Sequence, residues 1–215
     1  MSPARRPAAE GSRERLLQAA VELIAERGYA GTSVGDVCER AGLARTALYW
    51  HYGSKEGLLA EVVETVGTTW IEEIRKRTYL EGDPLLRVHR LVREWRRILA
   101  EQPELIRLPL VVQLEGGAAS ERTLAALRRV WARAEQAIVE GIEDGVGMRL
   151  PDLDLVAHTI MALLQGALLR PSVDPDEAQL DRVFEELART IVLLVWVRLP
   201  EELRRDGAPS LPPGS

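Results

Sequence analysis

The sequence predicts an all-α protein of about nine helices. Apolar residues recur at intervals of three and four positions in each long segment, and Gly and Pro separate one segment from the next. No segment alternates apolar and polar residues as a half-buried strand does. A chain of 215 residues can bury a sizeable core. These observations favour a globular helical fold.

The N-terminal quarter predicts three short helices. Ser12 is a suitable cap for the first helix, and Gly28 ends it. Ser33 and Asp36 have the spacing of a capping box, which predicts the start of the second helix. Gly42 then allows a tight turn because glycine adopts a left-handed conformation at little cost. The three helices are expected at Arg13–Arg27, Val34–Arg40 and Arg45–His51.

Helical patterns continue through the rest of the chain. Further helices are expected at Lys55–Arg77, Leu85–Ala100, Glu104–Glu115, Ser120–Asp144, Asp152–Arg170 and Asp176–Arg198. This pattern predicts two domains, an N-terminal domain at 12–54 and a larger helical domain at 55–199. Loose tails are expected at 1–11 and 200–215, where Pro and small residues are frequent.

The composition excludes several classes of protein. The longest fully apolar run, Ile191–Val197, is far shorter than the roughly 20 residues of a membrane span, and no apolar leader follows Arg5 and Arg6. Cys38 is the only cysteine, so neither an internal disulfide nor a cysteine metal cluster is expected. We therefore expect a cytoplasmic protein that does not contact a membrane.

Two patterns that could indicate an enzyme have simpler explanations. Gly31–Gly35 fits the G-x-S-x-G pattern of hydrolases, but that chemistry needs a strand before the serine, and a helix is expected there. His51, His89 and His158 lack the spacing of a zinc site. We therefore expect no catalytic residue, no metal and no cofactor.

The second and third predicted helices form a helix-turn-helix pattern. The first 55 residues contain eight basic and six acidic residues, although the whole chain carries a net charge of −5, so this end can bind a polyanion. Residues near the start of a helix in the major groove reach base edges. Arg45, Thr46 and Ala47 offer a guanidinium for guanine, a hydroxyl, and a methyl for thymine.

The remaining polar and aromatic groups of this segment suit the DNA backbone. Tyr49 and His51 lie one turn further along the helix, where phosphate is within reach, and the neighbouring Trp50 also has a group suited to DNA. Lys55 and the free N–H groups at the start of its helix form another phosphate site. The alternative is that Tyr49 and Trp50 are core aromatics.

The run from Arg13 to Glu61 resembles the DNA-binding domain of the TetR family of transcriptional regulators. The resemblance is strongest over Gly42–Leu59, which reads GLARTALYWHYGSKEGLL. It implies that Arg45, Thr46 and Ala47 read bases, and that Ser33, Tyr49, His51 and Lys55 contact phosphates. Gly35 departs from many members of the family, which have a polar or basic residue there.

Three tryptophans lie at the centres of apolar stripes in the larger predicted domain. Each alone also fits a core position, but as a set they resemble the ligand pocket of the TetR family. Polar residues at the edges of these stripes would orient a ligand in an apolar cavity. The candidate ligand-binding residues are Trp70, His89, Trp95, Gln113, Trp131 and Glu135. The expected ligand is hydrophobic or aromatic, and Glu135 with the Trp faces would suit a cation.

The predicted helices at 152–170 and 176–198 are apolar on more than one face. Thr190–Val197 carries no charge, and a helix of this kind must be covered on two sides. A partner subunit or burial inside a monomer would provide the second cover. The resemblance implies the partner, because TetR-family proteins dimerise through their last two helices.

The sequence thus predicts a homodimeric, sequence-specific regulator of transcription. We expect a repressor that a small molecule releases from operator DNA. A two-fold dimer places its recognition helices about 34 Å apart, which predicts a palindromic operator. Two alternatives stay open: an all-helical small-molecule binding protein without DNA binding, and a ligand-independent regulator or activator.

Overall fold

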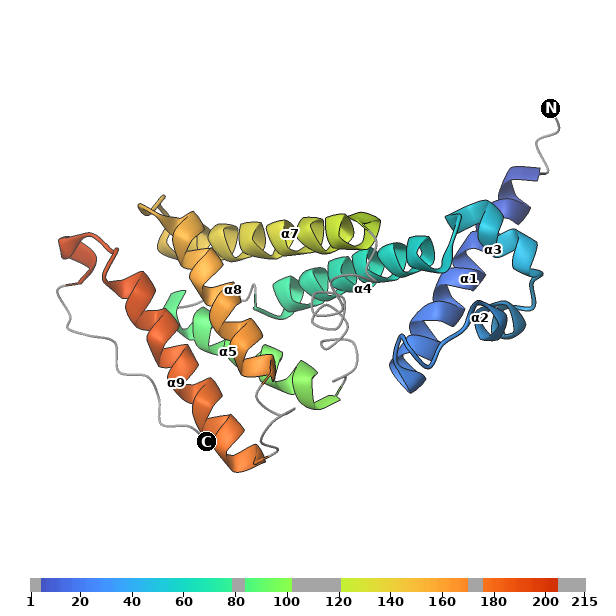
Figure 1. The fold of residues 1–215 in the computed structure, drawn as a ribbon. Coiled ribbons are helices and arrows are strands. Elements are labelled where there is room, and N and C mark those ends of the chain that lie inside the picture. Colours follow the sequence, from blue (N-terminus) through green and yellow to red (C-terminus); the bar gives the residue numbers. More distant parts are fainter. Residues whose placement is uncertain (1–4, 79–83, 102–120, 170–175, 205–215) are drawn as a thin grey trace. The chain divides into compact units, whose positions relative to one another are not determined.

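The structure is a computed structural model, and it describes residues 5–78, 84–101, 121–169 and 176–204. These ranges contain eight α-helices and one short 3-10 helix, and no strand (Figure 1). The all-α prediction is therefore confirmed. The helices are α1 (Arg5–Arg27), α2 (Val34–Ala41), α3 (Arg45–Tyr52), α4 (Lys55–Thr78), α5 (Pro84–Glu101), α7 (Glu121–Val146), α8 (Leu153–Leu169) and α9 (Glu177–Trp196), and the 3-10 helix is η2 (Glu201–Leu203).

The predicted bounds agree with these helices to within two residues, with one exception. The predicted start of the first helix at Arg13 is wrong, because α1 begins at Arg5. Pro7 fits in the first turn of a helix, where the missing N–H has no helical acceptor, so it does not prevent this earlier start. The helix expected at Glu104–Glu115 lies outside the described residues.

The first compact unit contains residues 5–69 and 121–131. α1, α2 and α3 pack together there with the first part of α4 and the first part of α7. Fully buried side chains from three of these helices form its core, including Leu23 in α1, Leu48 in α3 and Val62 in α4. α7 adds Ala126 and Leu127 to the same core, so the helix-turn-helix rests on a segment far away in sequence.

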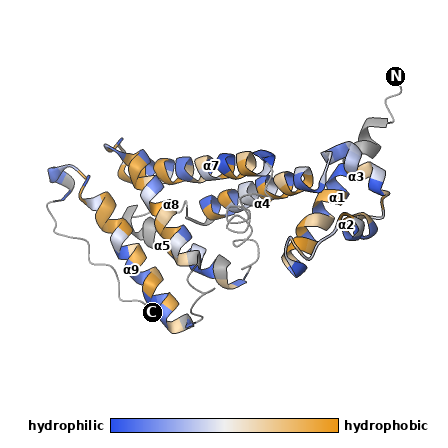
Figure 2. Ribbon diagram, in the orientation of Figure 1, coloured by the Kyte–Doolittle hydropathy of each residue, from blue (hydrophilic) through white to orange (hydrophobic). Residues whose placement is uncertain are grey.

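The second compact unit contains residues 70–78, 84–101, 132–169 and 176–204. α9 packs against both α5 and α8. Its core includes Val92 from α5, Ile160 and Leu164 from α8, and Ile191 from α9. Figure 2 shows how densely apolar residues occur along α8 and α9. Within the described ranges, no helix is both long and apolar enough to span a bilayer.

Candidate nucleic-acid interface and effector pocket

The first helix of the helix-turn-helix begins with a complete capping box. The backbone N–H of Ser33 donates to the Asp36 carboxylate at 2.8 Å, and the backbone N–H of Asp36 donates to the Ser33 hydroxyl at 3.1 Å. Hydrogen bonds to the Asp36 carboxylate from the side chain and the backbone N–H of Ser33 lower the pKa of this carboxyl. The hydroxyl of Ser33 therefore has a structural role as a helix cap.

The turn between α2 and α3 is closed by glycine. Gly42 has φ +64°, a conformation that disfavours any residue with a Cβ. Its N–H donates to the carbonyl of Glu39 at 3.1 Å, and the N–H of Leu43 donates to the carbonyl of Cys38 at 2.9 Å. The free carbonyls at the end of α2 are thus satisfied, and the start of α3 is fixed relative to α2.

α3 is anchored on one face and free on the other. Leu48 is completely buried, whereas Arg45 and Thr46 are exposed. Tyr49 and Trp50 keep 52% and 74% of their surface exposed, so the alternative that they are core aromatics is wrong. A pair of aromatic side chains this exposed on a short helix indicates a surface that meets a partner.

The start of α3 keeps its backbone donors available. Its N-cap is Ala44, which makes no side-chain hydrogen bond to the helix. The N–H of Ala47 donates to the Ala44 carbonyl at 2.9 Å, and the N–H groups of Arg45 and Thr46 lie at the positive end of the helix dipole, which favours an anion. Ala47 is half-buried against the core of the first unit, and only part of its methyl group can contact a partner.

His51 and Lys55 lie near the end of α3, and both are partly engaged within the protein. The His51 ring meets Trp50 edge-on, with ring centroids 4.6 Å apart. Burial and the positive charge of Arg13 lower the pKa of His51. The Lys55 ammonium donates a hydrogen bond to the backbone carbonyl of Tyr29 at 3.2 Å. The same ammonium lies 4.2 Å from the centre of the Tyr29 ring. Two of its three hydrogens remain for a phosphate.

The end of α3 is held by the buried Tyr52. Its hydroxyl donates to the carbonyl of Arg13 at 2.8 Å, and burial raises the pKa of Tyr52 to about 12. Its backbone carbonyl accepts a hydrogen bond from Arg122 of α7 at 3.1 Å. A Cβ on Gly57 would lie only 2.1 Å from the same carbonyl oxygen, so the close approach of α4 to α3 requires glycine.

Sequence reasoning missed this support from α7. Besides the Arg122 contact, the Thr123 hydroxyl donates to the backbone carbonyl of Glu56 at 3.3 Å, and Thr123 is fully buried. The one available signal was Gly57, a glycine in the first turn of a helix where most residues would be more favourable.

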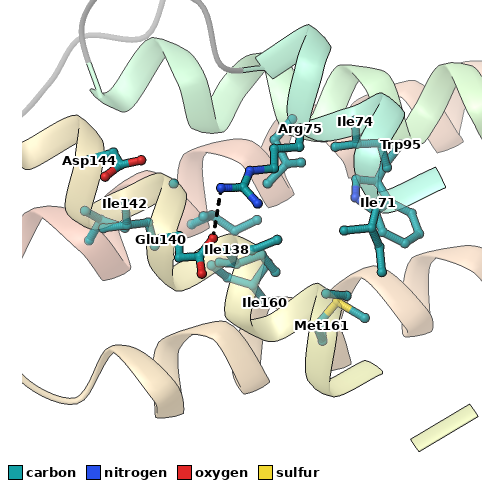
Figure 3. A pocket seen from close by; sticks show the side chains of 16 residues that line it. Ile71, Ile74, Arg75, Trp95, Ile138, Glu140, Ile142, Asp144, Ile160 and Met161 are labelled. Atoms are coloured by element: carbon teal, nitrogen blue, oxygen red, sulfur yellow. Dashed lines mark ion pairs between the residues drawn. The ribbon is translucent and has the colours of Figure 1, made fainter. Parts of the chain in front are cut away.

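A small apolar cavity lies in the second unit (Figure 3). Its volume is about 100 Å³. Side chains from α4, α5, α7, α8 and α9 line it, including Ile71, Ile74, Leu91, Trp95, Ile138, Ile142, Ile160, Met161, Ile191 and Val195. Arg75 and Glu140 form an ion pair of 3.1 Å at this cavity, and Asp144 lies one turn beyond Glu140 on α7. The cavity therefore combines an apolar body with a few charged groups.

The predicted ligand-binding residues do not all line this cavity. Trp95 lines it. Trp70 and Glu135 are half-buried outside its lining, and Glu135 instead pairs with His158 at 2.9 Å. Trp131 packs against the core of the first unit. The side chain of His89 and the whole of Gln113 lie outside the described residues.

The part of the chain that the structure describes contains no cluster of three or more His, Cys, Asp or Glu residues suited to a metal ion. Ser33 follows a helix and caps another, so the serine of the G-x-S-x-G pattern has no preceding strand. Its surroundings are those of a helix cap.

Comparison with known proteins agrees with the helix-turn-helix geometry. Residues 16–62 match the family described as bacterial regulatory proteins, tetR family. Residues 16–62 therefore form a TetR-family DNA-binding domain. The match covers α2, α3 and the contact between Tyr52 and Gly57, so the family region coincides with the anchored and exposed helix described above.

Two relatives of this chain are described as regulators of transcription. It is 33% identical over 78 residues to the HTH-type transcriptional regulator AcrR of Shigella flexneri, covering 36% of each chain. The chain thus spans about a third of the length of that relative. It is 27% identical over 183 residues to the HTH-type transcriptional repressor DhaR of Mycobacterium sp. (strain GP1), covering 81% of this chain and 91% of that one.

The similarity in fold to solved structures extends beyond the matched region. A TetR-family transcriptional regulator from Agrobacterium tumefaciens superposes with a TM-score of 0.68 at 19% identity, covering 85% of this chain and 98% of the other. The helical arrangement is therefore shared over most of the chain. At this identity the similarity concerns the fold.

Proposed function

We propose that the chain is a cytoplasmic homodimeric repressor that binds a palindromic operator and is released by a small hydrophobic or aromatic ligand. The observation that carries the proposal is the exposed face of α3, which presents Arg45, Thr46, Tyr49 and Trp50 beside an uncapped helix start. A rigid helix with these groups suits the major groove. The proposal assigns no catalytic role to the chain.

Base reading and phosphate contact are assigned to different groups. Arg45 and Thr46 are exposed at the start of α3, where base edges come within reach, and Ala47 offers part of its methyl group. Tyr49, Trp50, His51 and Lys55 would contact the sugar-phosphate backbone, as would Ser33 at the start of α2. A ring N–H of His51 can donate a hydrogen bond to phosphate.

The proposed dimer interface lies on the exposed faces of α8 and α9, where the second subunit would bind. Leu155 on α8 and Leu193 on α9 keep 62% and 50% of their surface exposed, and Leu163 of α8 and Val197, which directly follows α9, are also exposed. Burying such leucines against another subunit is favourable, at roughly 25 cal/mol for each Å² of apolar surface. Two antiparallel helices from each subunit would give a four-helix interface.

The effector is assigned to the cavity lined by Trp95 and Ile138. A cavity of about 100 Å³ is smaller than the roughly 300–1,000 Å³ of most ligand pockets, so a ligand larger than one ring must enlarge it. A ligand that binds only the enlarged form shifts the population of conformations toward that form. Because coupling is reciprocal, operator DNA would weaken ligand binding by the same factor.

DNA binding is tested by fluorescence anisotropy on fragments selected from random sequence by the purified protein. We expect Arg45→Ala to cost about 1–3 kcal/mol on the selected operator and less on random DNA. Lys55→Ala should weaken binding to all sequences equally and flatten the dependence on salt. Arg149→Ala, at an exposed arginine between α7 and α8, is the matched control and should change neither the affinity for the operator nor the dependence on salt. Absence of any sequence preference in the wild type would favour a ligand-binding protein that does not bind DNA.

Dimerisation and ligand response are tested separately. Sedimentation should give a dimer for the wild type at micromolar concentration and a monomer for Leu155→Glu, with Glu72→Gln at an exposed position of α4 as the control. Ile138→Trp should fill the cavity and abolish release by any compound that raises the melting temperature of the wild type. If a compound still releases the Ile138→Trp variant from operator DNA, the effector binds outside this cavity. If no compound releases the wild type from DNA, a ligand-independent regulator is favoured.

A further inference from the structure

We propose that Gly35 is a specificity-determining residue of the DNA interface, because it creates the space in which the guanidinium of Arg45 lies. A Cβ built on Gly35 would be 2.8 Å from Nη2 and 3.7 Å from Cζ of Arg45. The same Cβ would lie 3.4 Å from the hydroxyl oxygen of Ser33. The side chain of Arg45, at the start of α3, therefore lies against α2 at Gly35, the position where α2 has no side chain.

Packing against α2 is what positions this guanidinium. Arg45 is exposed, and no hydrogen bond or ion pair holds it within the ranges that the structure describes. Burial raises the pKa of the Cys38 thiol in α2, and the positive charge of Arg45 opposes this rise. The guanidinium thus lies in space that a side chain at position 35 would occupy, and its donors remain available for a base.

A methyl group at position 35 would alter this placement without threatening the fold. Gly35 is inside α2, and its φ is not positive, so alanine is more favourable than glycine for the helix itself. The atom that must move is the far end of a flexible side chain. Alanine should therefore leave stability unchanged or higher, and should displace the guanidinium by several tenths of an ångström or more.

Such a displacement matters because a bidentate contact has narrow geometry. Two parallel N–H groups must each reach an acceptor on guanine within hydrogen-bond distance. Moving the guanidinium breaks one of the two bonds or shifts both to a neighbouring base pair. Gly35 thus acts through Arg45, as a positioning residue that need not touch DNA.

The inference rests on the proposed function, and a double-mutant cycle tests it. Wild type, Gly35→Ala, Arg45→Ala and the double variant are titrated against the selected operator and against operators altered at each base pair in turn. We expect Gly35→Ala to reduce discrimination at the base pairs read by Arg45 by about fivefold or more and to leave the other positions and the salt dependence unchanged. In the Arg45→Ala background, Gly35→Ala should have no further effect.

Controls separate positioning from a general structural effect. Gly141→Ala, at a helical glycine with no atom within 4 Å of a Cβ, should leave discrimination unchanged. Gly35→Ser provides a second variant with the same clash, and urea unfolding confirms that each variant is folded. Unchanged discrimination in Gly35→Ala, or equal effects with and without Arg45, overturns the inference while leaving the proposed function intact. A wild type without sequence preference overturns both.

Discussion

Substitution of Gly57 by alanine should destabilise the helix-turn-helix, although the same change usually stabilises a helix. The added Cβ would lie 2.1 Å from the carbonyl oxygen of Tyr52 and 2.9 Å from Nη1 of Arg122. A carbon-oxygen contact needs about 3.2 Å or more, so backbone of α3 or α4 must move by about 1 Å. This backbone cannot give way as a flexible side chain can.

The magnitude follows from two opposing effects. Alanine gains about 1 kcal/mol over glycine inside a helix. Strain from overpacking and loss of the hydrogen bond from Arg122 to the Tyr52 carbonyl cost about 3–4 kcal/mol together. We therefore expect the free energy of unfolding to fall by roughly 2–3 kcal/mol, and operator affinity to fall because the end of α3 is displaced.

Urea unfolding followed by circular dichroism measures this difference, and Gly141→Ala is the matched control. Gly141 is also inside a helix, but no atom lies within 4 Å of its added Cβ, so that variant should gain about 0.5–1 kcal/mol. The free energy of unfolding should therefore fall in Gly57→Ala and rise in Gly141→Ala. If Gly57→Ala is as stable as Gly141→Ala and binds the operator normally, the close approach of α4 to α3 is not required.

Three further predictions concern the same unit. Ser33→Ala should cost about 1 kcal/mol of stability at neutral pH. Hydrogen bonds from Ser33 also hold the pKa of the Asp36 carboxyl below its ordinary value of 3.8. The stabilisation that the ionised Asp36 contributes is therefore present above about pH 4 and is lost as the pH falls through the lowered pKa, which acid titration of the unfolding midpoint measures. The pKa of His51 lies below its ordinary value of 6.5, so His51→Gln should remove a loss of stability that the wild type shows as the pH falls below 6.5. Arg122→Ala should cost about 1 kcal/mol through the lost hydrogen bond to α3, whereas Arg128→Ala, which removes an exposed ion pair with α7's first residue, should cost almost nothing in the same urea assay.

Local signals in the sequence were enough to predict the helix-turn-helix. Ser33, Asp36 and Gly42 act on their own neighbours in the chain, so their spacing fixes where α2 begins and ends. The alternation of buried Leu48 with exposed residues follows in the same way from helical periodicity. The start of α1 was missed because Pro7 and Gly11 suggest a loop when tertiary context is unknown.

Long-range packing could not be predicted from periodicity. A stripe indicates that Trp131 and Trp95 face an interior, but it does not say which interior. In the structure Trp131 packs in the first unit and Trp95 lines the cavity of the second. The clash that makes Gly57 necessary, and the contact of Arg45 with Gly35, likewise depend on two helices meeting in space.

The participation of α7 in the first unit has a consequence for protein engineering. A fragment that stops after residue 54 would lose Leu58 and Val62 of α4, and also Ala126 and Leu127 of α7, all of which are buried with the helix-turn-helix. Such a fragment would expose apolar surface and fold poorly. A chimaera that joins this helix-turn-helix unit to the ligand-binding domain of another protein must therefore include two separate stretches of sequence, 5–69 and 121–131. The junctions must let α4 and α7 continue as unbroken helices into the new domain.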